Sequence, residues 1–520
     1  MTLLGLANAF SLIVNSYDHN ESLYLTAGWL MVHDHRLYVD FAFWQMPYSP
    51  MIYAAVFKIF QPDNHLLAGK ITSFFFLVMA AVSLAGLVHH LSRRWWLTLA
   101  VTASFVLNIT VVRCAMEASN YIMPIAFSLA GCWAAVVGLS CSQRTPIWPG
   151  IAGLLMALAV GTKLYYLLAA FGAGVALLCV RREGGFPMVI KKLAVPYIIG
   201  FVVGLLPVLP FWFRDPELFM LNNLGAHHHT TAWWVETAAR YRANNIEPGL
   251  RLTLAEKSGF TQSVLAEPAN LALLITLFVA ISVYIKSGRQ LHLLSSAVLI
   301  AAGTFLCAWP AAFAPTPMWY QYLGMPIAFG VLLAGVLLAG MTALQSRTAL
   351  LLSSLMTACS LYGVAPFLKE NLVKLSNRSQ WVAVSLPQIA RELAAKTPGA
   401  GPAGGRLLCL QQLMAIESGL WTPYADLAYA PFTYVIADRL PEHLRHRSHF
   451  LGPQALADLL RKEPPAAVLS GLYDTGYWSD STLDQWCREQ GWVGVKNPYS
   501  LRIYVPPVAE KGHAERGTER

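Results

Sequence analysis

Charged residues are scarce in this chain, and their scarcity excludes an ordinary soluble domain. Of the 520 residues, 12% are charged and 56% are hydrophobic, whereas soluble domains carry about 25% charged residues. A water-soluble fold cannot bury this much apolar sequence, but a lipid bilayer can accommodate it. The composition therefore predicts an integral membrane protein.

Clustered cations and metal-binding cysteine patterns are also missing. The formal net charge is +9, but Lys and Arg are spread between apolar runs and form no single basic patch, so we predict no nucleic-acid partner. The eight cysteines show no metal-ligand spacing. Cys409 and Cys487 follow the apolar region, and their spacing leaves a disulfide open.

Long apolar runs are abundant, and many reach the roughly 20 residues that a membrane-spanning helix needs. Eight fit or nearly fit, at Leu66–Leu91, Trp95–Val112, Tyr121–Cys141, Ala194–Phe213, Leu271–Ile285, Leu293–Phe313, Tyr322–Met341 and Ala349–Leu368. Trp148–Gly161 and Leu164–Val180 are shorter, and we interpret them as a helical hairpin with Lys163 at its tip. Met1–Val14 lacks the basic segment and cleavage site of a signal peptide. We interpret it as a first span. Residues missing from its start are one explanation for its short length.

The total is about eleven spans, and the basic residues between them predict the orientation. They fall on one side of the membrane, at Arg93-Arg94, Arg144, Arg181-Arg182 with Lys191-Lys192, Lys286 with Arg289, and Arg347. By the positive-inside rule this side is cytoplasmic, which places the N-terminus inside and the C-terminus outside. A bacterial inner membrane is the default localisation.

The predicted fold is an all-α polytopic membrane domain followed by a small extracytoplasmic α/β domain. The membrane domain covers residues 1–368, with outer loops at about 15–65 and 214–270; the second domain covers 369–506, and 507–520 form a disordered tail. The second domain alternates expected helices (Trp381–Ala395, Pro453–Lys462, Leu483–Gln490) with expected strands (Arg406–Gln411, Thr433–Ala437, Ala466–Ser470, Leu501–Val505). Lys396–Gly405 is expected to be a loop because of its Pro and Gly content.

The first outer loop contains two acidic residues directly after the first span. Asp18 and Glu21 are three residues apart and would share one face of a helix. Leu23, Ala27, Leu30 and Met31 favour a short amphipathic helix in the membrane interface. Two interpretations stay open. The carboxylates either cap this helix and face water, or face a cavity at the lipid–water boundary.

Further segments give this loop a recognisable pattern. They are Leu37-Tyr38-Val39-Asp40-Phe41, Pro47-Tyr48-Ser49-Pro50 and, before the tenth span, Trp319-Tyr320-Gln321-Tyr322 followed by Pro326. With the span number, the long second outer loop and the trailing α/β domain, the pattern resembles polytopic glycosyltransferases of the GT-C class. The nearest branch contains protein O-mannosyltransferases and the aminoarabinose transferase of lipid A.

The resemblance implies an enzyme that transfers a sugar from a polyprenyl-phosphate donor to a lipid, glycan or protein acceptor on the outer face. Asp18 is the first choice for the catalytic base and Glu21 the second. The candidate substrate-binding residues, mostly cations for the lipid phosphate, are Asp40, Lys70, Arg113, Lys163, Arg242 and Tyr320, with Arg240 as a further cation. The alternative is that Lys70 and Lys163 reach to lipid headgroups and that Arg240 and Arg242 are plain loop charges.

Two departures from the family pattern bear on a metal. Asn20-Glu21 stands where the family often has Asp-Glu, and Asn120 stands where many members carry a metal-binding Asp. A divalent metal is therefore an open cofactor with no assigned ligands. His227-His228-His229 cannot all face one metal, and we expect a solvated or interface-lying loop. Trp233-Trp234 suits an aromatic belt or a sugar-stacking site.

Three other classes stay open. A transporter or flippase would show repeated halves or paired charges within the membrane, and neither is found in the sequence. An O-antigen-type polymerase or ligase would use arginine and histidine and tolerate loss of Asp18. A non-catalytic relative would use the outer domain as a scaffold, and the departures at Asn20 and Asn120 keep that class open.

Overall fold

The computed structural model describes most of the chain. The described residues are 1–140, 146–180, 185–243, 250–287, 292–341, 345–397, 405–430, 432–445, 447–471, 480–495, 499 and 501–506. The expected cytoplasmic residues Arg144, Arg181, Arg182 and Arg289, most of the expected loop 396–405 and the expected disordered tail lie outside these ranges.

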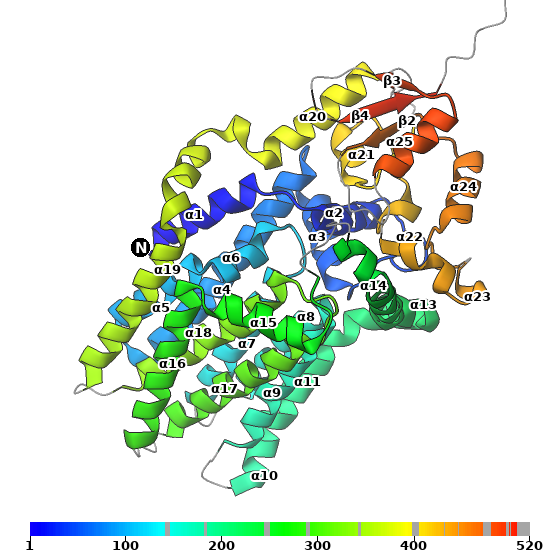
Figure 1. Cartoon of the computed structure of the whole chain (residues 1–520). Helices are drawn as coiled ribbons and strands as arrows, with labels where there is room; N and C mark the ends of the chain where they lie inside the picture. The colour runs from blue at the N-terminus through cyan, green and yellow to red at the C-terminus, as the bar shows by residue number, and fades with distance from the viewer. Residues whose placement is uncertain are drawn as a thin grey trace, which may run out of the picture.

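Apolar helices form a bundle that makes up most of the molecule (Figure 1). The bundle helices are α1 (Thr2–Asn15), α4 (His65–Ser92), α5 (Trp95–Leu107), α6 (Ile109–Met116), α7 (Ile122–Ser140), α8 (Ile147–Thr162), η1 (Leu164–Tyr166), α9 (Leu167–Leu178), α10 (Gly185–Val189), η2 (Ile190–Ala194), α11 (Val195–Leu205), η3 (Leu206–Val208), α12 (Leu209–Arg214), α16 (Pro268–Ser287), α17 (His292–Phe313), α18 (Gly324–Ala339) and α19 (Ser346–Ser376). Figure 1 shows α10 at one end of the bundle and the C-terminal strands at the other.

The number of apolar helices agrees with a polytopic membrane protein. In the described part of the chain, seven helices are long and apolar enough to cross a membrane, and the bent pair α5 and α6 would make an eighth. Three shorter apolar helices, Thr2–Asn15, Ile147–Thr162 and Leu164–Leu178, lie where the sequence predicts the remaining spans. The predicted polytopic helical fold is therefore confirmed, and the chain is an integral membrane protein.

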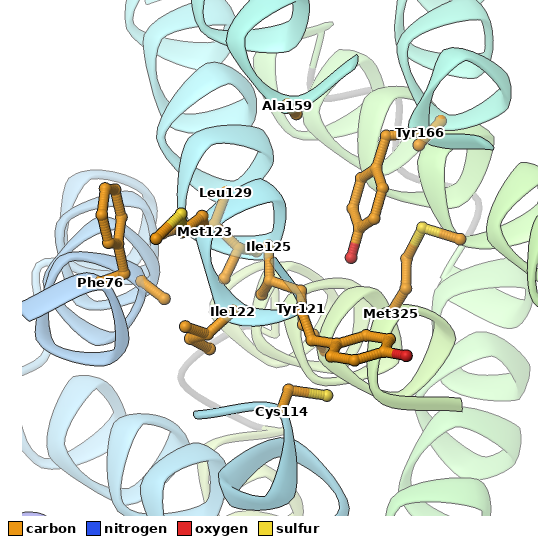
Figure 2. Packing of buried hydrophobic residues seen from close by; sticks show 14 of the residues in the cluster. Phe76, Cys114, Tyr121, Ile122, Met123, Ile125, Leu129, Ala159, Tyr166 and Met325 are labelled. Atoms are coloured by element: carbon orange, nitrogen blue, oxygen red, sulfur yellow. The ribbon is translucent and has the colours of Figure 1, made fainter. Parts of the chain in front are cut away.

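Burial differs sharply between the bundle helices. The apolar stretch that includes α18 is 94% buried, while that of α19 is 28% buried. The outward faces carry large apolar side chains such as Phe278 and Ile285, which suits a lipid-facing surface. Figure 2 shows Ile122, Met123 and Ile125 of α7 packed between Phe76 of α4 and Met325 of α18 in the bundle core.

The predicted span Trp95–Val112 is not one straight helix, because the chain bends by 58° between α5 and α6. Asn108 causes the break. Its side-chain oxygen accepts hydrogen bonds from the N–H groups of Thr110 and Val111, at 2.9 and 3.4 Å. An asparagine in this position caps the start of a new helix, and α6 then runs to Met116.

A second group of helices covers the end of the bundle nearest the C-terminal strands (Figure 1). These helices are α2 (His19–Val32), α3 (Tyr48–Phe60), α13 (Pro216–Met220), η4 (Leu221–Gly225), α14 (Ala226–Ala243), α15 (Leu254–Leu265) and η5 (Tyr320–Leu323). The expected amphipathic helix exists as α2, but it is buried on nearly all sides by α3, α4 and a C-terminal helix. It is therefore part of the protein core rather than a surface helix.

The C-terminal region contains a four-stranded sheet with strand order β1-β2-β4-β3. The strands are β1 (Leu407–Leu408), β2 (Ala467–Ser470), β3 (Val493–Val495) and β4 (Arg502–Val505). β1 pairs parallel to β2, with Leu407 opposite Ala467, and the other pairs are antiparallel. The C-terminal helices and turns are α20 (Val382–Lys396), α21 (Leu413–Ser418), η8 (Ala425–Leu427), α22 (Phe432–Ile436), η9 (Ala437–Arg439), α23 (Glu442–Arg445), α24 (Pro453–Lys462) and α25 (Asp480–Glu489).

Alternating side chains of the strands pack on opposite faces of the sheet, as the two-residue period of a strand requires. Leu407 and Leu469 join a core with α20, and Leu408 and Val468 join another with α24 and α25. The expected α/β character is therefore confirmed. The expected strand Thr433–Ala437 is wrong, because this segment forms α22 and buries Thr433 and Ile436 as helix residues. The expected limits of the two domains stay a prediction, and α19 continues past residue 369 to Ser376.

Candidate active site

A cavity of about 830 Å³ lies where the bundle, the outer helices and the C-terminal region meet. Its walls come from the start of α2, the segment Trp44–Met46, α14, the segment 314–322 and the C-terminal residues Tyr429 and Phe432. Segments distant in sequence thus enclose one space.

Asp18 lies in the wall of this cavity and also caps α2. Its carboxylate accepts a hydrogen bond from the N–H of Asn20 at 2.9 Å, and its own N–H donates to Glu21 Oε2 at 3.1 Å. His19 Nδ1 lies 3.1 Å from Asp18 Oδ1. The side chain of Asp18 keeps 38% of its surface exposed. The two interpretations of Asp18 are therefore compatible, since it caps a helix and faces the cavity.

Glu21 has a different environment, because it is fully buried in an ion pair with Lys70. The distance between Lys70 Nζ and Glu21 Oε1 is 2.5 Å. The same oxygen accepts from the N–H of Ala118 at 2.6 Å, and Lys70 also donates to the carbonyl of Met116 at 2.6 Å. Neither side chain is part of the cavity lining. This pair fastens α2 to α4 and to the turn after α6.

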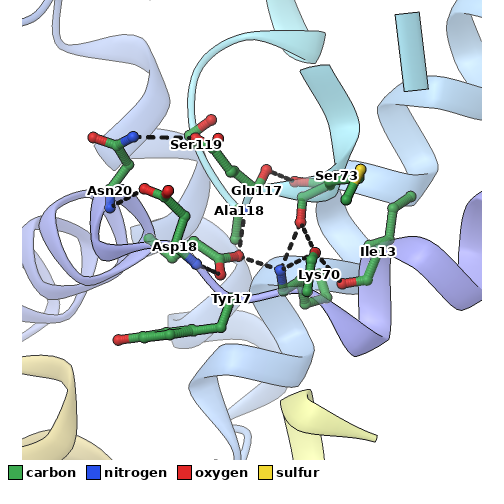
Figure 3. A network of polar contacts seen from close by, with 12 residues as sticks. Ile13, Tyr17, Asp18, Asn20, Lys70, Ser73, Glu117, Ala118 and Ser119 are labelled. Carbon is green, nitrogen blue, oxygen red and sulfur yellow. Dashed lines mark hydrogen bonds and ion pairs between the residues drawn. The ribbon is translucent and has the colours of Figure 1, made fainter. Parts of the chain in front are cut away.

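Glu117 is a neighbouring carboxyl group that the sequence analysis did not select. It accepts hydrogen bonds from Gln321 Nε2 at 2.6 Å and Asn20 Nδ2 at 3.3 Å, and both of these residues line the cavity. Burial, together with the carboxylate of Asp18, raises the pKa of Glu117 to about 8. Asn20 therefore connects the carboxyl groups of Asp18 and Glu117 (Figure 3). The only signal for Glu117 in the sequence is that it is an acidic residue between two adjacent apolar runs.

Lys163 is the buried cation of the cavity. It follows α8 directly in extended backbone, and its side chain is 3% exposed. The ammonium group donates to Asn120 Oδ1 at 3.0 Å and lies 3.3 Å from the ring centroid of Tyr121. The rings of Tyr165 and Tyr322 are each 5.3 Å away. Ring faces attract cations through their electron density, so Lys163 is held without a carboxylate among these contacts.

Aromatic side chains form much of the remaining wall. Trp44 lies 5.3 Å from Tyr429 and 6.1 Å from Phe432, measured between ring centroids. Trp234 and Trp319 also line the cavity. Rings of this kind can cover the apolar face of a sugar while leaving its hydroxyls free for hydrogen bonding.

The triple-histidine segment is helical, so the expected loop is wrong, whereas His227 and His228 are exposed, as expected of a solvated segment. His227 and His228 belong to the first turn of α14 and line the cavity. His227 Nε2 lies 2.8 Å from the carbonyl oxygen of Trp44. Desolvation within the cavity lowers the pKa of His227, which favours its neutral form.

Five of the six predicted substrate-binding residues lie outside the cavity lining, which contains Lys163 but not Asp40, Lys70, Arg113, Arg242 or Tyr320. Asp40 forms an ion pair with Arg36 at 2.7 Å, and Arg242 forms one with Glu256 at 2.7 Å. The guanidinium group of Arg113 lies 4.0 Å from the ring centroid of Tyr320, whose hydroxyl donates to Glu267. The further cation Arg240 lies over the ring of Tyr241, at 5.5 Å from its centroid.

The donor set does not suit the metal ion that the family pattern allows. Among the described residues, no three His, Cys, Asp or Glu side chains are grouped as metal ligands. Asn120 stands where many members of the resembled family carry an Asp. Its Oδ1 accepts hydrogen bonds from Tyr24 Oη at 2.9 Å and from the Lys163 ammonium group. A divalent cation at this oxygen would lie against a positive charge, which electrostatic repulsion disfavours.

No protein-family model and no curated protein sequence matches the chain. Solved structures do match. The structure of ArnT from Cupriavidus metallidurans bound to undecaprenyl phosphate has a TM-score of 0.61 at 12% identity, covering 98% of this chain and 97% of that one. Its apo state has a TM-score of 0.59 at 11% identity, covering 96% and 95%. The oligosaccharyltransferase of Archaeoglobus fulgidus tethered with an acceptor peptide has a TM-score of 0.50 at 13% identity, covering 90% and 69%.

The chain has the GT-C fold. ArnT and the oligosaccharyltransferase are both GT-C glycosyltransferases, so the resemblance predicted from the first outer loop is confirmed for the fold. Identities of 11 to 13% carry no residue-by-residue assignment. The roles of Asp18 and Lys163 therefore have to be argued from the cavity itself.

Proposed function

We propose that this protein is a membrane glycosyltransferase that moves a sugar from a polyprenyl-phosphate donor to an acceptor hydroxyl of a lipid, glycan or protein. One observation carries the proposal. A partly exposed carboxylate, Asp18, and a buried ammonium group, Lys163, line the same aromatic-walled cavity in a GT-C fold. The cavity thus combines an acceptor for a proton with a cation for a leaving phosphate.

The chemistry of the transfer assigns a task to each group. The acceptor oxygen attacks the anomeric carbon of the donor sugar, and the bond between that carbon and the phosphate oxygen breaks. Asp18 takes the proton of the acceptor hydroxyl as the new bond forms. The negative charge that develops on the departing lipid phosphate is stabilised by Lys163. Trp44, Tyr429 and Phe432 are placed to cover the sugar ring.

The fold and its neighbours support the donor class. The ArnT structure contains undecaprenyl phosphate, and a lipid phosphate can enter from the bilayer that surrounds the apolar helices. We place the cavity on the extracytoplasmic side, as the positive-inside rule predicts for the end that carries the C-terminal region. The inner membrane of a bacterium remains the proposed location.

The test is glycosyl transfer by the purified full chain in lipid nanodiscs. A panel of radiolabelled polyprenyl-phosphate sugars would serve as donors and host membrane extract as acceptor. We expect Asp18→Asn to lower kcat by roughly 10²- to 10⁴-fold, the range for loss of a general base, with donor binding and melting temperature retained. Because Glu21 lies outside the cavity, we expect Glu21→Gln to lower mainly the melting temperature and to change the kcat of the folded protein little.

Other outcomes would replace the proposal. If no donor is turned over, or if Asp18→Asn is as active as the unaltered protein, the catalytic assignment is wrong. Transfer that survives loss of Asp18 but depends on His227 would favour a polymerase or ligase mechanism. Movement of the lipid across the membrane without transfer would favour a flippase.

A further inference from the structure

Among the described residues, the cavity lining contains one lysine side chain, that of Lys163, and no arginine. Its ammonium group is nearly inaccessible to bulk water and contacts one amide oxygen and three tyrosine rings. None of these contacts is a carboxylate, so the ammonium group has no anionic partner among them, and low exposure strengthens the attraction between it and an incoming anion.

Asn120 holds this cation in a fixed orientation. Its side-chain nitrogen donates to Gln45 Oε1 at 3.2 Å and to the carbonyl of Thr162 at 3.3 Å, which directs the oxygen towards Lys163 and Tyr24. An aspartate here would neutralise the ammonium group by forming an ion pair. An asparagine keeps the hydrogen bond without cancelling the charge.

We propose that the Lys163 ammonium group, held by Asn120 and the Tyr121 ring, binds the phosphate of the lipid donor and does the work of a divalent metal. The site then functions without a metal ion. This inference rests on the proposed function for the identity of the ligand, which is the phosphodiester of the sugar donor and, after transfer, the polyprenyl phosphomonoester that leaves. Asn120 and Lys163 act together, because the asparagine orients the ammonium group without pairing it with a carboxylate.

The test measures binding of undecaprenyl phosphate to the full chain in nanodiscs, by quenching of tryptophan fluorescence, without any need for turnover. Undecaprenol, which lacks the phosphate, and inorganic phosphate serve as comparison ligands. We expect binding of undecaprenyl phosphate to be unchanged by EDTA and by added Mn²⁺, and to exceed that of either comparison ligand. Mn²⁺, Mg²⁺ and Zn²⁺ should leave the melting temperature unchanged, because a ligand that binds only the folded state would raise it.

Two variants give the sharpest contrast. Lys163→Gln should weaken lipid-phosphate binding by about 10- to 100-fold, the range for a lost charge-assisted hydrogen bond, and Mn²⁺ should not restore it. Asn120→Asp keeps the lysine but pairs it with a carboxylate, so it should also weaken binding at least tenfold. A metal-based site would respond in the opposite direction, because an added carboxylate would strengthen metal and phosphate binding together. Lys58→Gln, on the exposed surface of α3, is the matched control and should bind as the unaltered protein does.

Each result bears on a separate claim. Loss of binding in EDTA, or tighter Mn²⁺-dependent binding by Asn120→Asp, would overturn the metal-free site and leave the transferase proposal standing. Unchanged binding by a folded Lys163→Gln protein would overturn it as well. Metal-free binding that depends on Lys163, in a protein that transfers no sugar, would confirm the site and refute the transferase proposal.

Discussion

At the scale of single residues, the two acidic residues of the first outer loop have separate roles. The sequence places Asp18 and Glu21 on one helical face, yet Asp18 faces the cavity and Glu21 is buried against Lys70. Removing one partner of a buried ion pair costs about 3–5 kcal/mol, because the other charge is left uncompensated. Loss of activity in a Glu21 variant would therefore report on folding, whereas loss in an Asp18 variant would report on chemistry.

Glu117 provides a residue-scale test of the electrostatics beside the cavity. Its folded-state pKa of about 8 lies above the value of 4.5 for an unperturbed carboxyl, because of burial and the carboxylate of Asp18. A raised carboxyl pKa means that the folded state binds the proton more tightly than the unfolded state does. The resulting stabilisation is complete below about pH 4.5 and is lost as the pH rises through 8. We expect the melting temperature to fall over this range.

The variant Glu117→Gln should remove that fall, because an amide has no proton to lose. A turn of the Asn20 amide, presenting oxygen instead of nitrogen, can accommodate it. We expect Glu117→Gln to be more stable than the unaltered protein at pH 9, by on the order of 1 kcal/mol. Thermal melting between pH 4.5 and 9 measures this, with Glu370→Gln on exposed α19 as the control. Parallel melting curves for Glu117→Gln and the unaltered protein would contradict the assignment.

At the scale of elements, close contact between helices depends on glycine. A Cβ added to Gly200 of α11 would lie 1.8 Å from the carbonyl oxygen of Gly150 in α8, and one added to Gly153 would lie 1.9 Å from that of Tyr197. Small residues let membrane helices approach closely and pack by van der Waals contact. Because the obstructing atoms belong to the backbone, a side chain at Gly200 forces the helices apart.

We expect Gly200→Ala to destabilise the protein by at least about 1–3 kcal/mol, the usual cost of overpacking. Gly363→Ala is the matched control, since it lies in α19 and a Cβ there meets nothing within 4 Å. Melting temperatures of both variants in the same detergent measure the difference. Equal melting temperatures would mean that α8 and α11 do not depend on close contact.

The success of the sequence analysis also varies by element. Apolar runs predict spans because the bilayer sets their length, and α24 has the predicted bounds Pro453–Lys462. The bend at Asn108 was missed because a capping side chain interrupts an otherwise continuous apolar run. Residues 433–437 have strand-like composition, but 433–436 are helical and bury Thr433 and Ile436. Local propensity is a weak signal where tertiary contacts decide.

The site was predictable only in part for a similar reason. Asp18 and Lys163 could be selected because an acid and a lysine beside apolar runs are costly and therefore informative. Tyr429 and Phe432 could not, since the sequence does not show which distant segments meet, whereas Glu117 carries the same signal as Asp18 and was overlooked. Two candidates on the outer loops, Asp40 and Arg242, form ion pairs with Arg36 and Glu256.

At the scale of the whole molecule, the C-terminal region closes the cavity by docking on the first outer loop. Buried or partly buried hydrogen bonds join the C-terminal region to this loop and to the first turn of α4. Tyr17 Oη donates to Gln411 Oε1 at 2.5 Å, the N–H of Leu413 donates to Ser22 Oγ at 3.1 Å, and the N–H of Leu66 donates to Glu417 Oε1 at 2.6 Å. Exposed ion pairs join the same region to α13 and α14, at Arg439 with Glu236 and Arg447 with Asp215 and Glu217.

The buried contacts should dominate this docking, because exposed ion pairs contribute about 0–1 kcal/mol and are screened by salt. Tyr17→Phe combined with Ser22→Ala removes two of these hydrogen bonds, at a cost of roughly 2 kcal/mol. We expect backbone hydrogen exchange in α21 and α22 to become roughly 30-fold faster. Arg439→Gln combined with Arg447→Gln should change it less than fivefold. The opposite ranking, or a large acceleration by 0.5 M NaCl in the unaltered protein, would show that surface charge holds the cavity closed.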